Sequence, residues 1–257
     1  MISNFFLYLL SCSTVFVTIT QASPFNESSI LPLAVLNHDA IVGFPNDYGT
    51  GTLADLYAKY KPTLRVINGC VPFPAVDRNG NTGGGLNPSG AMNGRCSSSP
   101  GQIYIRSMRR ENNRLAVMYA WYFPKDQNVD GPVNGGHRHD WEHVVVWLSS
   151  QDSGARVIGI SYSGHGSYTK LSRAAGNIAF DGNRPKVGYS NYGGFNHSLR
   201  SERNGSGGGQ NMVNWARLTS AARNALQNTN FGSANCPIKD GTFEDKIADS
   251  WSSTYNN

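Results

Sequence analysis

The chain has 257 residues, a formal net charge of +5 and only 15% charged residues, with 29 glycines. So mild and scattered a basic charge, without a platform of aromatic and basic residues, excludes nucleic acid as the expected partner. It is compatible with an anionic membrane surface or acidic glycans. Low charge and abundant glycine favour a loop-rich, mainly β protein over a helical one, and the length allows two domains or one large all-β unit.

The N-terminus has the pattern of a secretory signal peptide. The first 23 residues carry no charged side chain and no histidine, and the apolar run Phe5 to Ile19 ends in Thr20-Gln21-Ala22-Ser23. This predicts a signal peptide over residues 1–22. The alternative, a membrane anchor, is disfavoured because the apolar run is too short to span a bilayer. We therefore expect a secreted, extracellular protein with an N-terminal arm over 23–36 and a folded domain over 37–257.

Four cysteines are present, and Cys12 lies in the predicted signal peptide. In an oxidising compartment Cys70 and Cys96 are the expected disulfide pair. The bond would close a loop rich in Gly, Asn and Ser, which is worth about 3 kcal/mol in the chain-entropy model. Cys236 is left over, and we expect it to be a buried free thiol rather than half of an intermolecular bridge.

The first half of the chain predicts one helix and several strands. Apolar spacing indicates a helix over 53–60, which stops at Lys61-Pro62. Strands are expected at 64–67 and 102–106, on either side of a turn-rich loop at 74–100. The run Leu-Ala-Val-Met-Tyr-Ala-Trp-Tyr-Phe at 115–123 predicts a central strand buried on both faces, ended by Pro124.

The second half continues the β pattern and ends in helices. Strands are expected at 139–148, 156–162 and 184–190, with a turn or bulge at Gly164-His165-Gly166. A long hairpin loop should connect the strands 115–123 and 139–148. Apolar spacing then predicts an amphipathic helix over 213–226 and a short helix over 243–248.

The richest chemistry lies at Gly136-His137-Arg138-His139-Asp140-Trp141-Glu142-His143. Because alternate residues of a strand share a face, Asp140 and Glu142 should point one way and Trp141 and His143 the other. Asp126 ends the preceding strand at the same rim of the sheet. Gly135 and Gly136 leave His137 free to turn onto the acid face. Asp126, His137, Asp140 and Glu142 are therefore expected to surround one point.

Carboxylates held together repel one another unless a proton or a cation intervenes. An oxygen-rich site with one imidazole suits Ca²⁺, Mg²⁺ or Mn²⁺. His137, His139 and Asp140 are also a possible zinc site, which would suggest a metal-dependent hydrolase. A third interpretation has no metal: Arg138 neutralises the acids, and His139 is a satisfied core histidine.

The motif resembles a family signature. Gly136 to Glu142 is similar to the heptapeptide of the necrosis- and ethylene-inducing-peptide-like (NLP) cytolysins of plant-associated microbes. Further family-like blocks are Asn37-His38-Asp39-Ala40, residues 68–77, residues 116–126, residues 231–235 and Phe243. The resemblance covers roughly residues 35–250, and the single cysteine pair is like the one-disulfide type.

The resemblance implies a single-domain antiparallel β-sandwich with flanking α-helices, similar to actinoporins and fungal lectins. It implies no enzymatic activity but a Ca²⁺ or Mg²⁺ ion held by Asp126, Asp140 and Glu142 with His137 alongside. The implied partners are sugar headgroups of plant glycosylinositol phosphorylceramide sphingolipids at the eudicot plasma membrane. A plant pattern-recognition receptor for segment 116–142 is also implied, and we expect a monomer. Further candidate ligand-binding residues are His139, His165, Tyr192, Asn196 and His197.

The sequence departs from the family pattern beside this site. The loop 190–197 lacks the tryptophan that inserts toward the membrane in cytolytic members, and Tyr192 is the nearest aromatic residue. Because many members of the family are not cytolytic, a binding or immune-eliciting protein that does not lyse membranes is the main alternative.

Overall fold

A mixed β-sheet forms the centre of the computed structural model, which describes residues 34–131, 135–192 and 196–256. The predicted signal peptide and almost all of the predicted arm lie outside these residues. The described residues belong to one unit of the chain, Leu33–Asn257. The strands are β1 (Val35–Leu36), β2 (Thr63–Val66), β3 (Thr82–Gly83), β4 (Ile103–Arg109), β5 (Leu115–Gln127), β6 (Gly136–Leu148), β7 (Val157–Gly164), β8 (Ser167–Ser172), β9 (Phe180–Asp181), β10 (Arg184–Ser190), β11 (Ser198–Ser201) and β12 (Met212–Asn214).

The strand order is β12-β4-β5-β6-β7-β11-β10-β2, with β8 beside β7, β9 beside β10, and a separate pair of β1 and β3. One residue pair, Gly164 with Ser198, connects β7 to β11. The sheet folds over there, so that Phe123 of β5 stacks on Tyr189 of β10 with ring centroids 3.9 Å apart. This face-to-face packing of two halves is what a sandwich requires, whereas the likeness to actinoporins and fungal lectins stays a prediction.

The prediction of an antiparallel sheet was too simple. Within the described residues three strand pairs are parallel: β1 with β3, β2 with β10, and β4 with β12. Each joins segments far apart in the sequence, as parallel pairs must, because a parallel partner needs a long crossover connection. Alternation of apolar residues predicts that a segment is a strand but not the direction of its neighbour.

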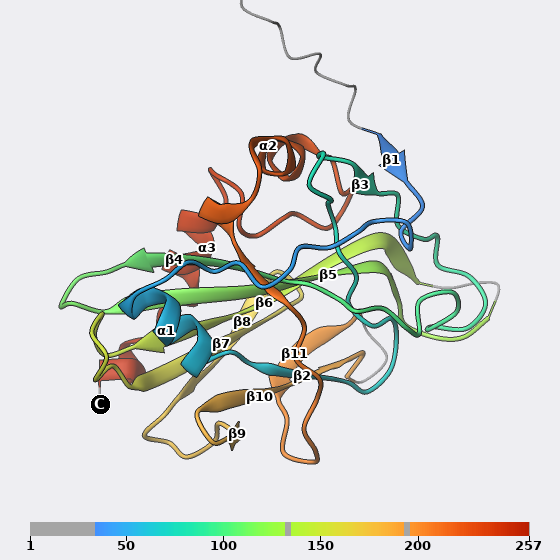
Figure 1. Cartoon of the computed structure of the whole chain (residues 1–257). Coiled ribbons are helices and arrows are strands. Elements are labelled where there is room, and N and C mark those ends of the chain that lie inside the picture. Colours follow the sequence, from blue (N-terminus) through green and yellow to red (C-terminus); the bar gives the residue numbers. More distant parts are fainter. Residues whose placement is uncertain (1–33, 132–134, 193–195, 257) are drawn as a thin grey trace, which may run out of the picture. The chain divides into compact units, whose positions relative to one another are not determined.

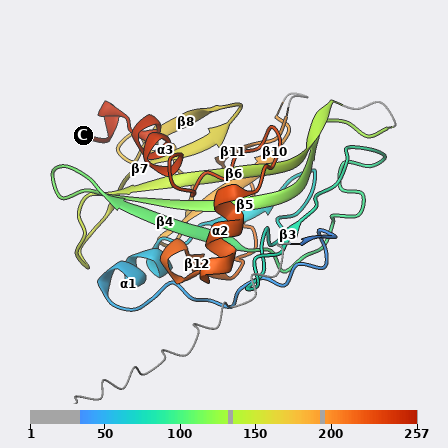
Figure 2. The ribbon, with the colours of Figure 1, turned by 90° about the horizontal axis from the view of Figure 1, so that it is seen from above.

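The helices are α1 (Thr52–Lys59), α2 (Ser220–Asn228) and α3 (Phe243–Ser250), with 3₁₀ turns η1 (Trp215–Arg217) and η2 (Ser253–Asn256). Helices α2 and α3 lie on one side of strands β4 to β7, and α1 lies on the other (Figures 1 and 2). Between them β5 is buried along its whole length. The predicted helices at 53–60 and 243–248 are confirmed.

The predicted helix over 213–226 was wrong in its first half. Met212–Asn214 forms strand β12 beside Ile103–Ile105, and a 3₁₀ turn follows. Helix α2 begins only after Thr219, whose side chain accepts a hydrogen bond from the Ala222 N–H over 3.1 Å. Threonine is a favoured N-cap, so a helix start signal was present inside the apolar pattern.

The prediction that Pro124 ends its strand was wrong, because β5 continues to Gln127. Its carbonyl accepts a hydrogen bond from the Leu86 N–H over 2.7 Å. On β6 the residue opposite is His139, with a left-handed φ of 61°. Two irregular residues thus face each other, and the regular pairing resumes with Lys125 and Arg138.

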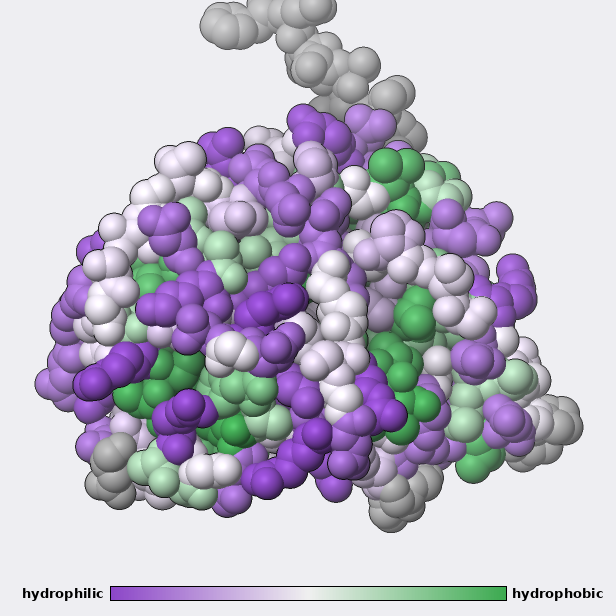
Figure 3. Space-filling model, turned by 60° about the horizontal axis from the view of Figure 1, so that its bottom comes forward, coloured by the Kyte–Doolittle hydropathy of each residue, from purple (hydrophilic) through white to green (hydrophobic). Residues whose placement is uncertain are grey.

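The face of the molecule in Figure 3 is mostly hydrophilic, and its hydrophobic residues form separate small patches. Of the large hydrophobic residues that the structure describes, Val35, Val42, Ile67 and Val129 are exposed. None of the described helices is long and apolar enough to cross a membrane.

Candidate cation and headgroup site

The candidate site lies where the sheet opens. Strand β7 pairs with β6 only from Val144 to Leu148, and then turns away to meet β11. The edge of β6 from Gly136 to His143 is therefore not covered by β7. A pocket of about 460 Å³ occupies this opening, and its lining includes Asp126, Asp140 and Glu142. The geometry of the strands, rather than a separate loop, creates the pocket.

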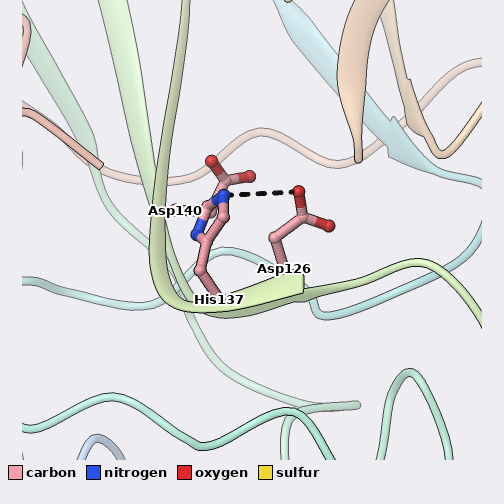
Figure 4. A group of neighbouring side chains, drawn as sticks. All are labelled: Asp126, His137 and Asp140. Atoms are coloured by element: carbon pink, nitrogen blue, oxygen red, sulfur yellow. Dashed lines mark ion pairs between the residues drawn. The ribbon is translucent and has the colours of Figure 1, made fainter. Parts of the chain in front are cut away.

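Asp126, His137 and Asp140 point toward one another at the pocket wall (Figure 4). Each offers one donor atom, and these atoms all lie within 4.8 Å of one another. Asp126 and His137 are opposite each other in the β5–β6 pairing, so their side chains emerge on the same face. Nε2 of His137 lies 3.8 Å from Oδ2 of Asp126, too far for a hydrogen bond.

His137 and Asp140 share a face because the alternation is interrupted between them. Residues three apart in a regular strand point to opposite sides. The left-handed φ of 61° at His139 shifts the phase by one residue. The sequence reasoning assigned this freedom to Gly135 and Gly136, whereas the structure assigns it to His139.

The ring of His137 is held in one orientation. Its Nδ1 lies 2.7 Å from the carbonyl oxygen of His139. A carbonyl can only accept, so Nδ1 carries the proton and Nε2 of the neutral ring has a free lone pair toward Asp126. A histidine that donates its second nitrogen to a backbone carbonyl is the usual arrangement of a metal ligand.

Asp126 is fixed by His197. Nδ1 of His197 donates to Oδ1 of Asp126 over 2.6 Å, and the backbone N–H of His197 contacts both carboxylate oxygens at 3.2 and 3.1 Å. The imidazole also stacks on Tyr189 with centroids 4.6 Å apart. His197 is buried, so it positions an acid of the site rather than meeting solvent.

Asp140 and Glu142 are buried beside one another on the same face, as alternation predicted. Burial, with Glu142 and Asp126 nearby, raises the pKa of Asp140 well above its usual range. Burial also raises the pKa of Glu142 to about 8, against a hydrogen bond from the Ser163 hydroxyl. The Tyr189 hydroxyl donates to Asp140 over 2.9 Å.

This arrangement fits a divalent cation. Ca²⁺–oxygen distances of about 2.3–2.6 Å place ligands on opposite sides of one ion about 5 Å apart, and the donor atoms of the cluster meet that limit. Within the described residues no lysine or arginine forms an ion pair with Asp126 or Asp140. Asp126, His137 and Asp140 would hold such an ion, and the ion would offset the burial and the repulsion that raise the pKa values of Asp140 and Glu142. Glu142 lies outside the three-residue group but lines the same pocket.

Arg138 does not neutralise the acids, contrary to the metal-free alternative. It donates to the carbonyl of Gly84 over 2.6 Å and to Oδ1 of Asn87 over 2.6 Å. His139, in contrast, has the core role which that alternative gave it. Its Nδ1 bonds the Tyr122 hydroxyl over 2.6 Å, and its ring packs edge-on against Phe231. His139 therefore lies on the helix-covered side, away from the pocket that we expected it to line.

The remaining predicted ligand residues divide into two groups. His165, on the turn between β7 and β8, and Asn196 line the pocket. Tyr192 does not line it; instead, the Arg200 guanidinium lies 4.1 Å from the centre of its ring. The disulfide between Cys70 and Cys96 is present, and Cys236 is buried and free. Burial raises the pKa of the Cys236 thiol to about 12.

Sequence reasoning missed several residues of the site. Tyr189, Ser163 and Lys246 come from three other elements, β10, β7 and α3, and each contacts or faces the acids of β6. No local pattern marks them, because only the fold brings these elements together. Gly69 could have been found as a glycine in a tight turn: a Cβ there would lie 2.4 Å from Nε2 of His197.

Residues 54–250 match the model of the family described as necrosis inducing protein (NPP1). NLP effector protein 10 of Phytophthora capsici is 43% identical over 222 residues, which cover 85% of this chain and 92% of that protein. Necrosis-inducing protein NPP1 of Phytophthora nicotianae is 42% identical over 227 residues, covering 87% of this chain and 93% of that protein.

Two solved structures are similar to this chain over most of its length. NLPPya in complex with mannosamine is 40% identical with a TM-score of 0.77, and covers 85% of this chain and 100% of its own. The non-toxic HaNLP3 protein is 37% identical with a TM-score of 0.76, and covers 83% of this chain and 98% of its own. The chain therefore belongs to the necrosis inducing protein (NPP1) family.

Proposed function

We propose that this chain is a secreted toxin or effector that binds Ca²⁺ or Mg²⁺ through Asp126, His137, Asp140 and Glu142. The observation that carries the proposal is the pair of buried carboxylates facing an oriented imidazole nitrogen. A buried acid cluster without a cationic partner is costly unless protons or an ion compensate it. A metal-dependent hydrolase is the less favoured alternative, because an oxygen-rich donor set suits Ca²⁺ or Mg²⁺ better than zinc.

We further propose that the ion and the pocket hold the sugar headgroup of plant glycosylinositol phosphorylceramide. The pocket is large enough for a sugar, at about 460 Å³, and His165 and Asn196 add polar groups to its wall. NLPPya has been solved with mannosamine and with glucosamine, which supports an amino-sugar or hexose ligand for this pocket. In this proposal His197 acts through Asp126, and Tyr192 contacts the ligand or membrane from the neighbouring loop.

Binding to the headgroup would bring a monomer to the eudicot plasma membrane, where it permeabilises the bilayer. The alternative, a protein that elicits immunity without lysis, is favoured by the loop 190–197, which lacks the expected tryptophan and has Tyr192 as its nearest aromatic residue. The solved relative HaNLP3, which is non-toxic, shares the fold at 37% identity. In both cases a plant receptor would sense segment 116–142.

The test is dye release from vesicles that contain the plant sphingolipid, with and without EDTA. Lysis should stop in EDTA and in Asp140→Asn, and it should persist in Asp181→Asn, which removes a carboxylate at an exposed position outside the lining of the pocket. Lysis that survives both EDTA and Asp140→Asn would overturn the cation mechanism. Vesicle binding without dye release, together with leaf immunity without necrosis, would assign the eliciting role.

A further inference from the structure

The end of the β5–β6 hairpin carries opposite charges on its two faces. Asp126 and His137 are register partners, and the next pair, Lys125 and Arg138, also face each other. The first pair lines the cation pocket. The second pair lines a different pocket of about 560 Å³, formed with the N-terminal segment at His38 and the disulfide loop.

This second pocket is lined by three cationic side chains, Arg95, Lys125 and Arg138, and by no acid. Asp130 lies near Lys125, but its Oδ1 accepts the Met92 N–H over 2.6 Å, outside the lining. The positive charges of Arg95 and Lys125 repel one another, an effect that Asp130 opposes from outside the lining. An anion in the pocket would remove this repulsion.

Two of the cations are fixed in place by neutral acceptors. Nζ of Lys125 donates to the carbonyls of Ser89 and Ala91 over 3.3 and 2.9 Å, and to Oε1 of Gln127 over 2.6 Å. These contacts use all three of its protons and favour the charged ammonium, whereas burial lowers the pKa of Lys125. Arg138 donates through Nη1 to the carbonyls of Gly84 and Gly85 and through Nη2 to Asn87, which leaves Nε–H and one Nη2 proton available.

Arg95 supplies the free donors. Its side chain is exposed and has no hydrogen bond or ion pair with the described residues. Its backbone is held by two neighbours: Cys96 in the disulfide and His38, whose Nε2 donates to the Arg95 carbonyl over 2.8 Å. A guanidinium with five open donors, in a pocket lined also by two fixed cations, offers the donor chemistry that a phosphate group accepts.

We propose that this pocket binds a phosphate group, with Arg95 and Arg138 as its hydrogen-bond donors and Lys125 as a fixed positive charge. The site is distinct from the cation pocket, since it lies on the other face of the hairpin and uses none of the acids. The phosphate could belong to a soluble phosphate compound or to a phospholipid headgroup. Both carry the phosphate oxygens that would accept hydrogen bonds in this pocket.

The first experiment titrates inorganic phosphate into the purified protein in metal-free buffer and follows binding by calorimetry. Saturable binding is expected, and Arg95→Gln should weaken it about tenfold, the loss expected for charge-assisted hydrogen bonds. Arg109→Gln is the matched control, because Arg109 is exposed at the opposite end of the β5 pairing. Addition of Mg²⁺ should leave the phosphate affinity unchanged.

The second experiment replaces free phosphate by vesicles of phosphatidylcholine with or without phosphatidic acid. Binding to phosphatidic acid that Arg95→Gln weakens and free phosphate displaces would assign the lipid source. Phosphate binding without vesicle binding would assign a soluble source. The proposal is overturned if phosphate does not saturate, or if Arg95→Gln and Arg109→Gln weaken binding equally, because binding would then reflect overall basic charge. Neither experiment depends on the bound cation. Failure of the phosphate proposal can therefore be distinguished from failure of the proposed function.

Discussion

Asp126 receives three contacts from a single residue, His197, through one ring nitrogen at 2.6 Å and the backbone N–H at 3.1 and 3.2 Å. Both side chains are buried. The carboxylate therefore has one orientation before any ion arrives. A ligand fixed in advance binds with a smaller loss of conformational entropy. His197 thus connects the β10–β11 half of the sheet to the acids of the β5–β6 half.

Replacement of His197 by Phe should lower cation affinity by about 10- to 100-fold, the effect typical of residues that orient metal ligands. Phenylalanine keeps the stack on Tyr189 but removes the hydrogen bond from Nδ1. The affinity is measured by calorimetry with Ca²⁺ and Mg²⁺, and circular dichroism checks the fold. An unchanged affinity in a folded variant would show that the backbone contacts alone hold Asp126.

Gly69→Ala should weaken the site through His197. Gly69 has a φ of 82°, and its added Cβ would lie 2.4 Å from Nε2 of His197. Gly49→Ala is the matched control, because Gly49 has a φ of 89° with no atom within 4 Å of the added Cβ. The control should cost about 1–2 kcal/mol of unfolding free energy from the left-handed backbone alone. Gly69→Ala should cost more and lower cation affinity, as measured by urea unfolding and calorimetry; equal costs would exclude the steric effect.

Asp140→Asn should have opposite effects on the two forms of the protein. Without a cation the substitution removes a carboxyl group whose ionisation is disfavoured by burial and by Glu142 and Asp126, so the melting temperature should rise or stay unchanged. With excess Ca²⁺ the wild-type protein should gain stability and the variant should not, because only binding to the folded state stabilises. Thermal melts with and without Ca²⁺ measure both, and Asp181→Asn should behave like the wild type. If the variant still gains stability from Ca²⁺, Asp140 is not a ligand of the cation.

The metal-free protein should lose stability as the pH rises from about 4.5 to about 8. Burial raises the pKa of Glu142 from 4.5 to about 8 and raises that of Asp140 in the same direction. Between these limits the folded state keeps protons that the unfolded state releases, so the stabilisation present below the unfolded pKa disappears through the folded pKa. Chemical unfolding in EDTA across this range tests the slope. Ca²⁺ should stabilise more at pH 8 than at pH 5, since protons compete for the carboxylates; the reverse order would contradict the buried acid cluster.

Removal of the disulfide should destabilise the protein and the cation site together. Replacing Cys70 and Cys96 by Ser opens a loop with a sequence separation of 26, worth about 3–4 kcal/mol in the chain-entropy model. Gly69, which lies against His197, precedes Cys70 directly. Urea unfolding and Ca²⁺ titration of the double variant measure both effects. Loss of stability with intact Ca²⁺ affinity would confine the disulfide to a global role.

The sequence was sufficient to predict that Asp126, His137 and Asp140 lie together, but not the mechanism that assembles them. Alternation placed Asp140 and Glu142 on one face correctly, because that segment is a regular strand. Alternation could not place His139. The left-handed backbone of His139 points its own ring toward Tyr122 and places His137 on the same face as the acids. His197 and Tyr189 reach the site only because the sheet folds over at Gly164, and no local period encodes that fold.

The burial of β5 has a consequence for the proposed recognition of segment 116–142 by a plant receptor. All thirteen residues from Leu115 to Gln127 are buried, as is β6 from His139 onward. On the intact molecule the accessible described residues of segment 116–142 lie at the hairpin end, where Val129, Asp130 and Arg138 are exposed. A receptor that binds the buried strands would require the chain to be unfolded or cleaved first, whereas one that binds the hairpin end would not. Escape by substitution is equally constrained, because most changes that alter the peptide also alter the core of the sheet.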